Sequence, residues 1–329
     1  MMFNRTMPLN FARQLLNRKS YVFVCPKFTE NNLAESRGYR LRELLQPSCF
    51  IEVEYTCSGT DADNRIRESF KIYCPNGEER EFLSLRKNDM VAFIKYLRTI
   101  SAVLVVDFTL LNTRFLGSFF AILSLIDWDE VYFCYTEPGA YNKCNDTTGF
   151  DLKNITMGFE QIPSLETLHD SMELSDWLVF LGFEGSRAMR IEEETSSYRR
   201  YTLPFICIPP MKPAWYNYAI EANSQFFELR VKDMDGVDFV SATNPFDTYQ
   251  VLNRFKGKAE HLIITPLGPK PVMLGCIMYV LENVDDMILF DNPFQDGSNT
   301  KEFGPSHFYD LTQFIKTVKN TRYTMIGGV

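Results

Sequence analysis

Histidine is scarce in this chain of 329 residues, which contains only His169, His261 and His307. Because the three are far apart in the sequence, a zinc site or a Ser-His-Asp triad would have few candidates to draw on. Eight cysteines are present, but no two of them form a CxxC pair. The sequence therefore disfavours a zinc site and a triad hydrolase, and its cysteines are expected to be reduced core thiols.

Net positive charge and long apolar runs are also missing. The chain has 34 basic and 42 acidic side chains, a net charge of -8, so no overall positive field attracts nucleic acid or anionic lipid. The longest apolar stretch, residues 115–126, is interrupted by Gly117 and Ser118 and is shorter than the roughly 20 residues that cross a bilayer. No signal-peptide pattern opens the chain. We expect a cytoplasmic protein without membrane association.

What is present is enough apolar material to fold, since 45% of the residues are hydrophobic. From residue 101 onward, short β-branched runs alternate with amphipathic segments, a pattern typical of βαβ units. We therefore predict a Rossmann-like α/β domain over residues 101–329, with a mainly parallel sheet covered by helices on both faces. The predicted strands are 102–108, 131–135, 177–182, 205–208, 237–242, 262–265 and 287–291, and the predicted helices are 114–126, 186–194, 215–224, 245–255, 271–283 and 309–319.

The first hundred residues have a different pattern. Strands are predicted at 21–25, 50–57 and 70–73, followed by a helix over 87–98. This order indicates a small α+β module over residues 1–100, with a domain boundary near Ile100.

Candidate ligand-binding residues follow the predicted strand 262–265. In an open parallel sheet, ligands bind outside the carboxyl ends of the strands, where helix N-termini present N–H groups. Thr265, Gly268 and Lys270 lie there, and a glycine, a lysine and a helix start suit a phosphate. The segment lacks the GK[ST] ending of a Walker A motif, which disfavours a P-loop ATPase. Alternatively, Gly268 only makes the turn and Lys270 is solvated.

A second candidate segment is 182–187. Ser186 can cap the helix that follows, Arg187 can bind a carboxylate or phosphate, and Glu184 can accept from a hydroxyl or an amine. The GxSxG pattern of lipases is absent. The alternative for Arg187 is an ion pair with Glu193 or Glu194 on the helix surface.

Four further candidates come from the remaining strand ends. Asn244 and Asp247 are placed to cap a helix and could also contact a ligand. Asp107 and Glu137 end neighbouring predicted strands, where two carboxylates could act as acid and base or hold a ribose. Asp107 could equally be a buried cap.

The order of elements from residue 177 to 291, with its 268–273 turn and Met-bearing helix, resembles the Rossmann-like ligand-sensing domains of the CARF type. In that family a Gly-Thr-Lys turn lies beside a bound cyclic oligonucleotide, and the domains pair as dimers. Gly268, Lys270 and Met273 match the family's positions, whereas Pro269 stands where the turn has threonine. The resemblance implies a nucleotide ligand and a homodimer or partner protein.

Three hypotheses follow. The leading one is a nucleotide- or phosphate-binding sensor or accessory subunit in a bacterial antiviral defence or nucleic-acid-linked system, its context resting on the resemblance. The second is an enzyme acting on a nucleotide or phosphorylated metabolite, with Asp107, Glu137 or Glu184 as acid or base. The third is an interaction subunit of a larger assembly. No cofactor is indicated.

Overall fold

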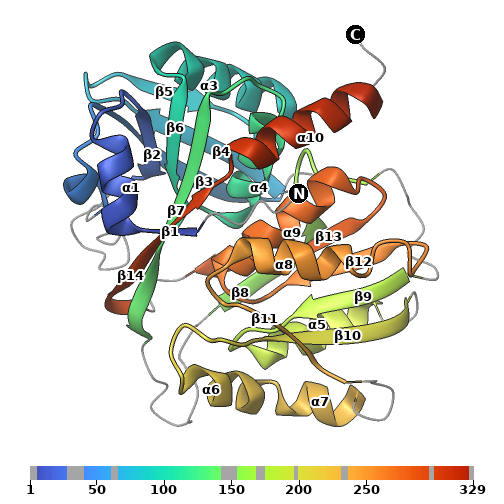
Figure 1. Cartoon of the computed structure of the whole chain (residues 1–329). Helices are drawn as coiled ribbons and strands as arrows, with labels where there is room; N and C mark the ends of the chain where they lie inside the picture. Colours follow the sequence, from blue (N-terminus) through green and yellow to red (C-terminus); the bar gives the residue numbers. More distant parts are fainter. Residues whose placement is uncertain are drawn as a thin grey trace. The chain divides into compact units, whose positions relative to one another are not determined.

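The structure, a computed structural model, describes residues 6–27, 41–60, 66–141, 154–167, 175–195, 199–230, 236–295 and 300–325. The chain forms two compact units. The first unit comprises residues Met1–Ala140 and Thr300–Val329, and the second comprises Tyr141–Asn299. The second unit is thus inserted into the first, whose two parts are coloured blue to green and red in Figure 1.

The first unit contains an eight-stranded sheet. Its order is β1-β14-β7-β6-β2-β3-β4-β5. The four strands β7, β6, β2 and β3 are parallel, while β4 and β5 continue the sheet antiparallel, and β1 pairs antiparallel with β14. The bounds are β1 Thr6–Pro8, β2 Val22–Pro26, β3 Cys49–Thr60, β4 Ile66–Tyr73, β5 Glu79–Phe82, β6 Val103–Asp107, β7 Glu130–Tyr141 and β14 Thr300–Asp310.

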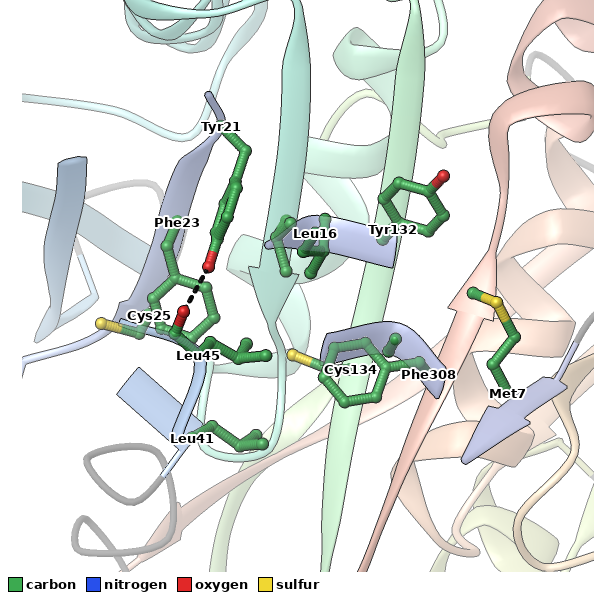
Figure 2. Close-up of a cluster of buried hydrophobic side chains, with 12 residues drawn as sticks. Met7, Leu16, Tyr21, Phe23, Cys25, Leu41, Leu45, Tyr132, Cys134 and Phe308 are labelled. Carbon is green, nitrogen blue, oxygen red and sulfur yellow. Dashed lines mark hydrogen bonds between the residues drawn. The ribbon is translucent and has the colours of Figure 1, made fainter. Parts of the chain in front are cut away.

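Helices cover both faces of this sheet, because the central strands β2 and β6 are continuous apolar runs whose side chains point to both faces. On one face, α1 (Leu9–Leu16) and the helical residues 41–45 pack on Phe23, and Tyr21 donates to the Leu45 carbonyl at 2.9 Å, as Figure 2 shows. On the other face, Phe70 meets rings from α3 (Lys87–Ile100) and α4 (Thr113–Leu123). The terminal helix α10 (Thr312–Met325) stacks its Phe314 on Phe120 of α4.

The second unit contains a six-stranded sheet in the order β11-β10-β9-β12-β13-β8. Its first five strands are parallel, and β8 closes one edge antiparallel. The bounds are β8 Asn154–Gln161, β9 Ser175–Phe180, β10 Arg199–Cys207, β11 Asp238–Val240, β12 Leu262–Pro266 and β13 Met287–Gln295.

This sheet too lies between helices (Figure 1). On one face, Trp177 of β9 packs with Ile191 of α5 (Gly185–Thr195) and Phe226 of α7 (Ser224–Arg230). On the other face, Phe180 stacks on Phe205, whose ring meets Phe255 at the end of α8 (Pro245–Asn253). The remaining helices are α9 (Lys270–Glu282), packed against α8, and α6 (Trp215–Ala222), which precedes α7.

The predicted α/β class, Rossmann-like with parallel strands between helices, is confirmed. The compact units, however, do not follow the boundary predicted near Ile100. Strand β6 pairs with β2, at Val22 beside Leu104, and β7 pairs with β6, so both belong to the N-terminal sheet and not to one long sheet over 101–329. Apolar periodicity identifies a strand but not the strand it pairs with, which explains the difference.

Within the described residues, no helix is long and apolar enough to cross a membrane. Every cysteine in the same part of the chain is a free thiol, and four of these, Cys25, Cys74, Cys134 and Cys276, are buried in the core while the others are half-buried. Tyr141 is the last residue of β7, and residues 142–153 lie outside the described residues.

Candidate functional site

The strand order of the second unit defines a topological switch point. Numbered by their place among the parallel strands, β11, β10, β9, β12 and β13 form the order 3-2-1-4-5. The chain therefore moves one way from β9 to β10 and β11, then returns to the other side of β9 with β12. Ligands of such sheets bind outside the carboxyl ends of the two strands at the reversal. Here these are β9 and β12.

The two segments singled out from the sequence, 182–187 and 268–270, follow these two strands and lie against each other. The Leu267 amide donates to the Phe180 carbonyl at 2.9 Å. A Cβ on Gly182 would be 2.3 Å from the Leu267 carbonyl oxygen, so the backbones approach where only glycine fits. The structure thus brings these two segments together at one edge of the sheet.

Gly268 differs from its neighbouring glycines in what surrounds it. At Gly185, which starts α5, a Cβ would fall 1.8 Å from the Ala222 carbonyl oxygen. At Gly268, a Cβ would meet only ordinary contacts, the nearest being the Leu181 carbonyl oxygen at 3.5 Å, and no left-handed φ is required. The protein's own packing explains Gly182 and Gly185 but does not require glycine at Gly268.

Two helix N-termini lie at this edge. Helix α5 begins at Gly185 and α9 begins at Lys270, with Pro269 at its N-cap and no side chain capping it. The first turn of a helix presents backbone N–H groups and a partial positive charge to an anion. A tetrahedral anion is the ligand that such a pair of helix starts favours.

Glu184 and Arg187 form an ion pair in this segment. Arg187 Nη1 lies 2.7 Å from Glu184 Oε2, and the side chains are 10% and 16% exposed. Glu184, at the end of β9, is therefore a partner of Arg187. Ser186 is exposed at the start of α5.

Thr265, Asn244 and Asp247 make hydrogen bonds within the fold. Buried Thr265 Oγ1 accepts from the Trp177 indole at 2.8 Å. The Asn244 side chain caps α8 by accepting from the Phe246 amide, and Asp247 Oδ2 accepts from the Ser241 amide at 2.7 Å. Helix α8 follows β11, and its first turn packs against α9, where a Cβ on Gly275 would fall 2.4 Å from the Pro245 carbonyl oxygen.

Two of the three predicted catalytic carboxylates, Asp107 and Glu137, belong to the first unit, whereas Glu184 belongs to the second. Asp107 ends β6 and is fully buried. Its Oδ1 accepts from the amide of Thr109 at 2.9 Å and from its hydroxyl at 2.5 Å. This geometry is an Asx turn in the loop after β6, and the N-cap of the following helix, α4, is Asn112.

The sequence did not reveal the partner of Glu137, which is His307 of β14. Glu137 Oε1 lies 2.5 Å from His307 Nε2, and the hydroxyls of Thr136 and Ser306 share a hydrogen bond of 2.9 Å beside this pair. A carboxylate in this position orients the imidazole ring. The two residues are 170 positions apart in the sequence, and β14 was not predicted as a strand, so the contact was missed.

Two thiols flank Asp107 in the sheet register, Cys25 on β2 and Cys134 on β7. Burial, and then the nearby Asp107 carboxylate, raises the pKa of each thiol well above its ordinary value. A neutral thiol is a poor nucleophile, so this row is packing and not a catalytic cysteine site. No group of His, Cys, Asp or Glu that could hold a metal ion occurs among the residues that the structure describes.

The chain matches no protein-family model, no curated protein and no solved structure. The resemblance to CARF-type domains therefore stays a prediction from the order of elements and from Gly268, Lys270 and Met273.

Proposed function

We propose that the chain binds a nucleotide or a related phosphate-bearing ligand at the carboxyl ends of β9 and β12. The observation that carries the proposal is the switch point of the second sheet. There segments 182–187 and 268–270 lie next to each other, and each contains the first residue of a helix, α5 or α9. Both segments carry a cation in a chain whose net charge is -8.

The chemistry of the two segments suits a phosphate. The N-terminus of α9 stabilises a negative charge by about 0.3–1 kcal/mol at an exposed position, and Lys270 adds a point charge there. The ion pair with Glu184 holds the Arg187 guanidinium in place, and a guanidinium binds phosphate oxygens through paired hydrogen bonds. Gly268, which packing does not require, would allow the backbone to approach the ligand closely.

A role as sensor or accessory subunit in a bacterial defence system is the biological context we propose. It rests on the CARF-type resemblance and on no contact in the structure.

The test is a thermal-shift screen of the full chain with mono-, di- and cyclic nucleotides, repeated with Lys270→Ala. A ligand at a hundred times its Kd stabilises the folded state by about 2.7 kcal/mol, so a bound nucleotide raises the melting temperature measurably. We expect Lys270→Ala to weaken binding about tenfold or more, since a hydrogen bond to a charged group contributes about 1.5–3 kcal/mol.

The matched control is Lys256→Ala, which removes an exposed lysine of the same unit beyond the C-terminal end of α8. It should leave the nucleotide affinity unchanged. A wild-type protein that no nucleotide stabilises, or equal affinities in Lys270→Ala and wild type, would contradict the proposal.

One observation favours the enzyme alternative. The carboxylate-oriented His307 is partly exposed beside Glu137, an arrangement suited to general acid–base catalysis. Turnover of a nucleotide that Glu137→Gln abolishes, with the fold retained, would support an enzyme over a sensor.

A further inference from the structure

Asn223 is a buried residue at the junction of α6 and α7. It is 1% exposed and forms the C-cap of α6. Its backbone N–H donates to the carbonyls of Ala219 and Ile220, and its backbone carbonyl accepts from the Phe227 amide at 3.0 Å. Because both backbone groups bind to the two helices, α6 and α7 fix the position of this residue.

The side chain of Asn223 reaches the segment that follows β9. Its Nδ2 donates to the Gly182 carbonyl and to the Ala219 carbonyl, each at 2.8 Å. An amide nitrogen carries two hydrogens, so both donors of this side chain are used. One bond stabilises the end of α6, and the other holds the backbone of segment 182–187.

A second contact joins this segment to the same junction. At Gly185, the first residue of α5, a Cβ would lie 1.8 Å from the Ala222 carbonyl oxygen and 3.3 Å from the Asn223 Cα. Gly182 also approaches the Leu267 carbonyl oxygen. The segment therefore contacts the α6–α7 junction as well as the chain that follows β12.

The Asn223 Oδ1 atom indicates why an amide occupies this position. It is buried without a hydrogen-bond partner among the described residues. Buried polar atoms in native proteins are nearly always paired, and an unpaired one costs about 1–3 kcal/mol. An apolar side chain would avoid this cost but could not donate to the Gly182 carbonyl. The two bonds of Nδ2 are thus what the amide contributes, and the bond to Gly182 is the one that leaves α6.

We infer that Asn223 is a positioning residue for the phosphate site and acts on the ligand through segment 182–187. Its bond to Gly182 sets the backbone path from the end of β9 to α5, and thereby places Arg187 and the first N–H groups of α5. The inference rests on the proposed function and deepens it. A segment that occupies its binding position for about a tenth of the time weakens the measured affinity about tenfold.

Asn283 provides a matched control, because it is the same kind of cap at the other end of the unit's second site helix, α9. It is 9% exposed, its backbone N–H donates to the carbonyls of Tyr279 and Val280, and its Nδ2 donates to the Tyr279 carbonyl at 2.8 Å. Helix α9 is 13 residues long, so Asn283 lies about 20 Å from the Lys270 end of the helix. Alanine at either asparagine removes a cap bond, but Asn223→Ala also removes the bond to Gly182.

The first measurement is the affinity of the full chain for the four ribonucleoside 5′-monophosphates, by isothermal titration calorimetry. Asn223→Ala should bind the tightest of them about tenfold more weakly than wild type, a difference of about 1.4 kcal/mol, and Asn283→Ala should bind it as wild type does. The second measurement is hydrogen–deuterium exchange of the ligand-free protein. The backbone amides of residues 183–187 should exchange faster in Asn223→Ala and at the wild-type rate in Asn283→Ala.

Asn223→Asp keeps the shape of the side chain and makes its donor depend on pH. A protonated carboxyl has one O–H donor and an ionised one has none, and burial raises the pKa of a carboxyl group. The affinity of this variant relative to wild type should therefore be lowest at about pH 8 and should rise toward about pH 5. The ratio to wild type cancels the titration of the phosphate and of Glu184, which both measurements share. This isosteric variant also carries the test if Asn223→Ala does not fold.

The outcomes separate this inference from the proposed function. Nucleotide affinities that Asn223→Ala and Asn223→Asp leave unchanged would overturn the inference and leave the phosphate site standing. Equal losses of affinity in Asn223→Ala and Asn283→Ala would also overturn it, because helix capping would then explain both. A weaker affinity without faster exchange at residues 183–187 would overturn the positioning role. Failure of wild type to bind any of the four nucleotides would overturn the proposed function and this inference with it.

Discussion

At the scale of single residues, the glycines of the switch point are of two kinds: some are required by the packing of the protein itself, and one is not. Gly185 leaves no room for a Cβ, which would lie 1.8 Å from the Ala222 carbonyl oxygen, and Gly182 meets Leu267 in the same way. Gly268 has room for a methyl group and no left-handed φ. Sequence alone marks all three as turn glycines, because the atoms that face them come from distant segments.

We therefore predict opposite effects of alanine at these positions. Gly185→Ala should lower the free energy of unfolding by about 1–3 kcal/mol or more, because backbone must move to admit the Cβ. Gly268→Ala should leave that free energy unchanged or raise it by about 0.4–1 kcal/mol, since alanine restricts the unfolded chain. Urea unfolding of the full chain measures both, and a loss of stability in Gly268→Ala equal to that in Gly185→Ala would refute this assignment.

Other residue contacts show where sequence reasoning stops. The segment 182–187 was identified from the sequence as a candidate site. The ion pair between Arg187 and Glu184, however, depends on the backbone path between the end of β9 and the start of α5, which the sequence does not show. Thr265 looked like a ligand-binding residue because it ends an apolar strand. In the structure its hydroxyl accepts from Trp177, which is 88 residues away and on the neighbouring strand.

At the scale of helices and strands, the sequence predicted the buried strands correctly and missed several exposed ones. Parallel strands covered on both faces are nearly continuous apolar runs, so β6, β9 and β12 were all identified from the sequence. The missed strands lie toward the sheet edges and are polar: β5 reads EREF, and β14 contains Gly304 and Pro305. Proline within a run argues against a strand, so the His307 contact could not be foreseen.

Helix α8 allows a prediction at this scale, because Asn244 was expected either to cap it or to contact a ligand. The Asn244 side chain accepts from the Phe246 amide at 3.2 Å, and Pro245 follows at the first helical positions. Asn244→Ala should therefore lower the free energy of unfolding by about 1 kcal/mol and leave the nucleotide affinity unchanged.

Asn112→Ala is the matched control, since Asn112 caps α4 of the first unit in the same manner. It should show a similar loss of stability in urea unfolding. If Asn244→Ala lost nucleotide affinity with no loss of stability, Asn244 would be a ligand contact and not a cap.

At the scale of the whole molecule, the chain contains two α/β sheets, each with its own point of strand reversal. In the first sheet the reversal falls between β2 and β6, at Cys25 and Asp107, which are buried and engaged in packing and turn contacts. In the second it falls between β9 and β12, which are followed by segments 182–187 and 268–270 with their glycines, helix starts and cations. This difference is why we propose that the second unit, and not the first, binds the ligand.

The division into two units could not be predicted from the sequence, for a physical reason. The inserted second unit separates β7 from β14, and β6 resembles the strands of the second unit in length and apolarity. Nothing local distinguishes a strand of one sheet from a strand of the other. Only long-range pairing, such as β6 with β2, assigns each strand to its sheet.

Hydrogen–deuterium exchange of the full chain, with and without the tightest-binding nucleotide, tests ligand binding at the second unit most directly. We predict that the ligand slows exchange of the backbone amides in segments 182–187 and 268–273, next to Phe183 and Lys270. Protection confined to the first unit, around Asp107 and Glu137, with no change in these two segments, would contradict this assignment.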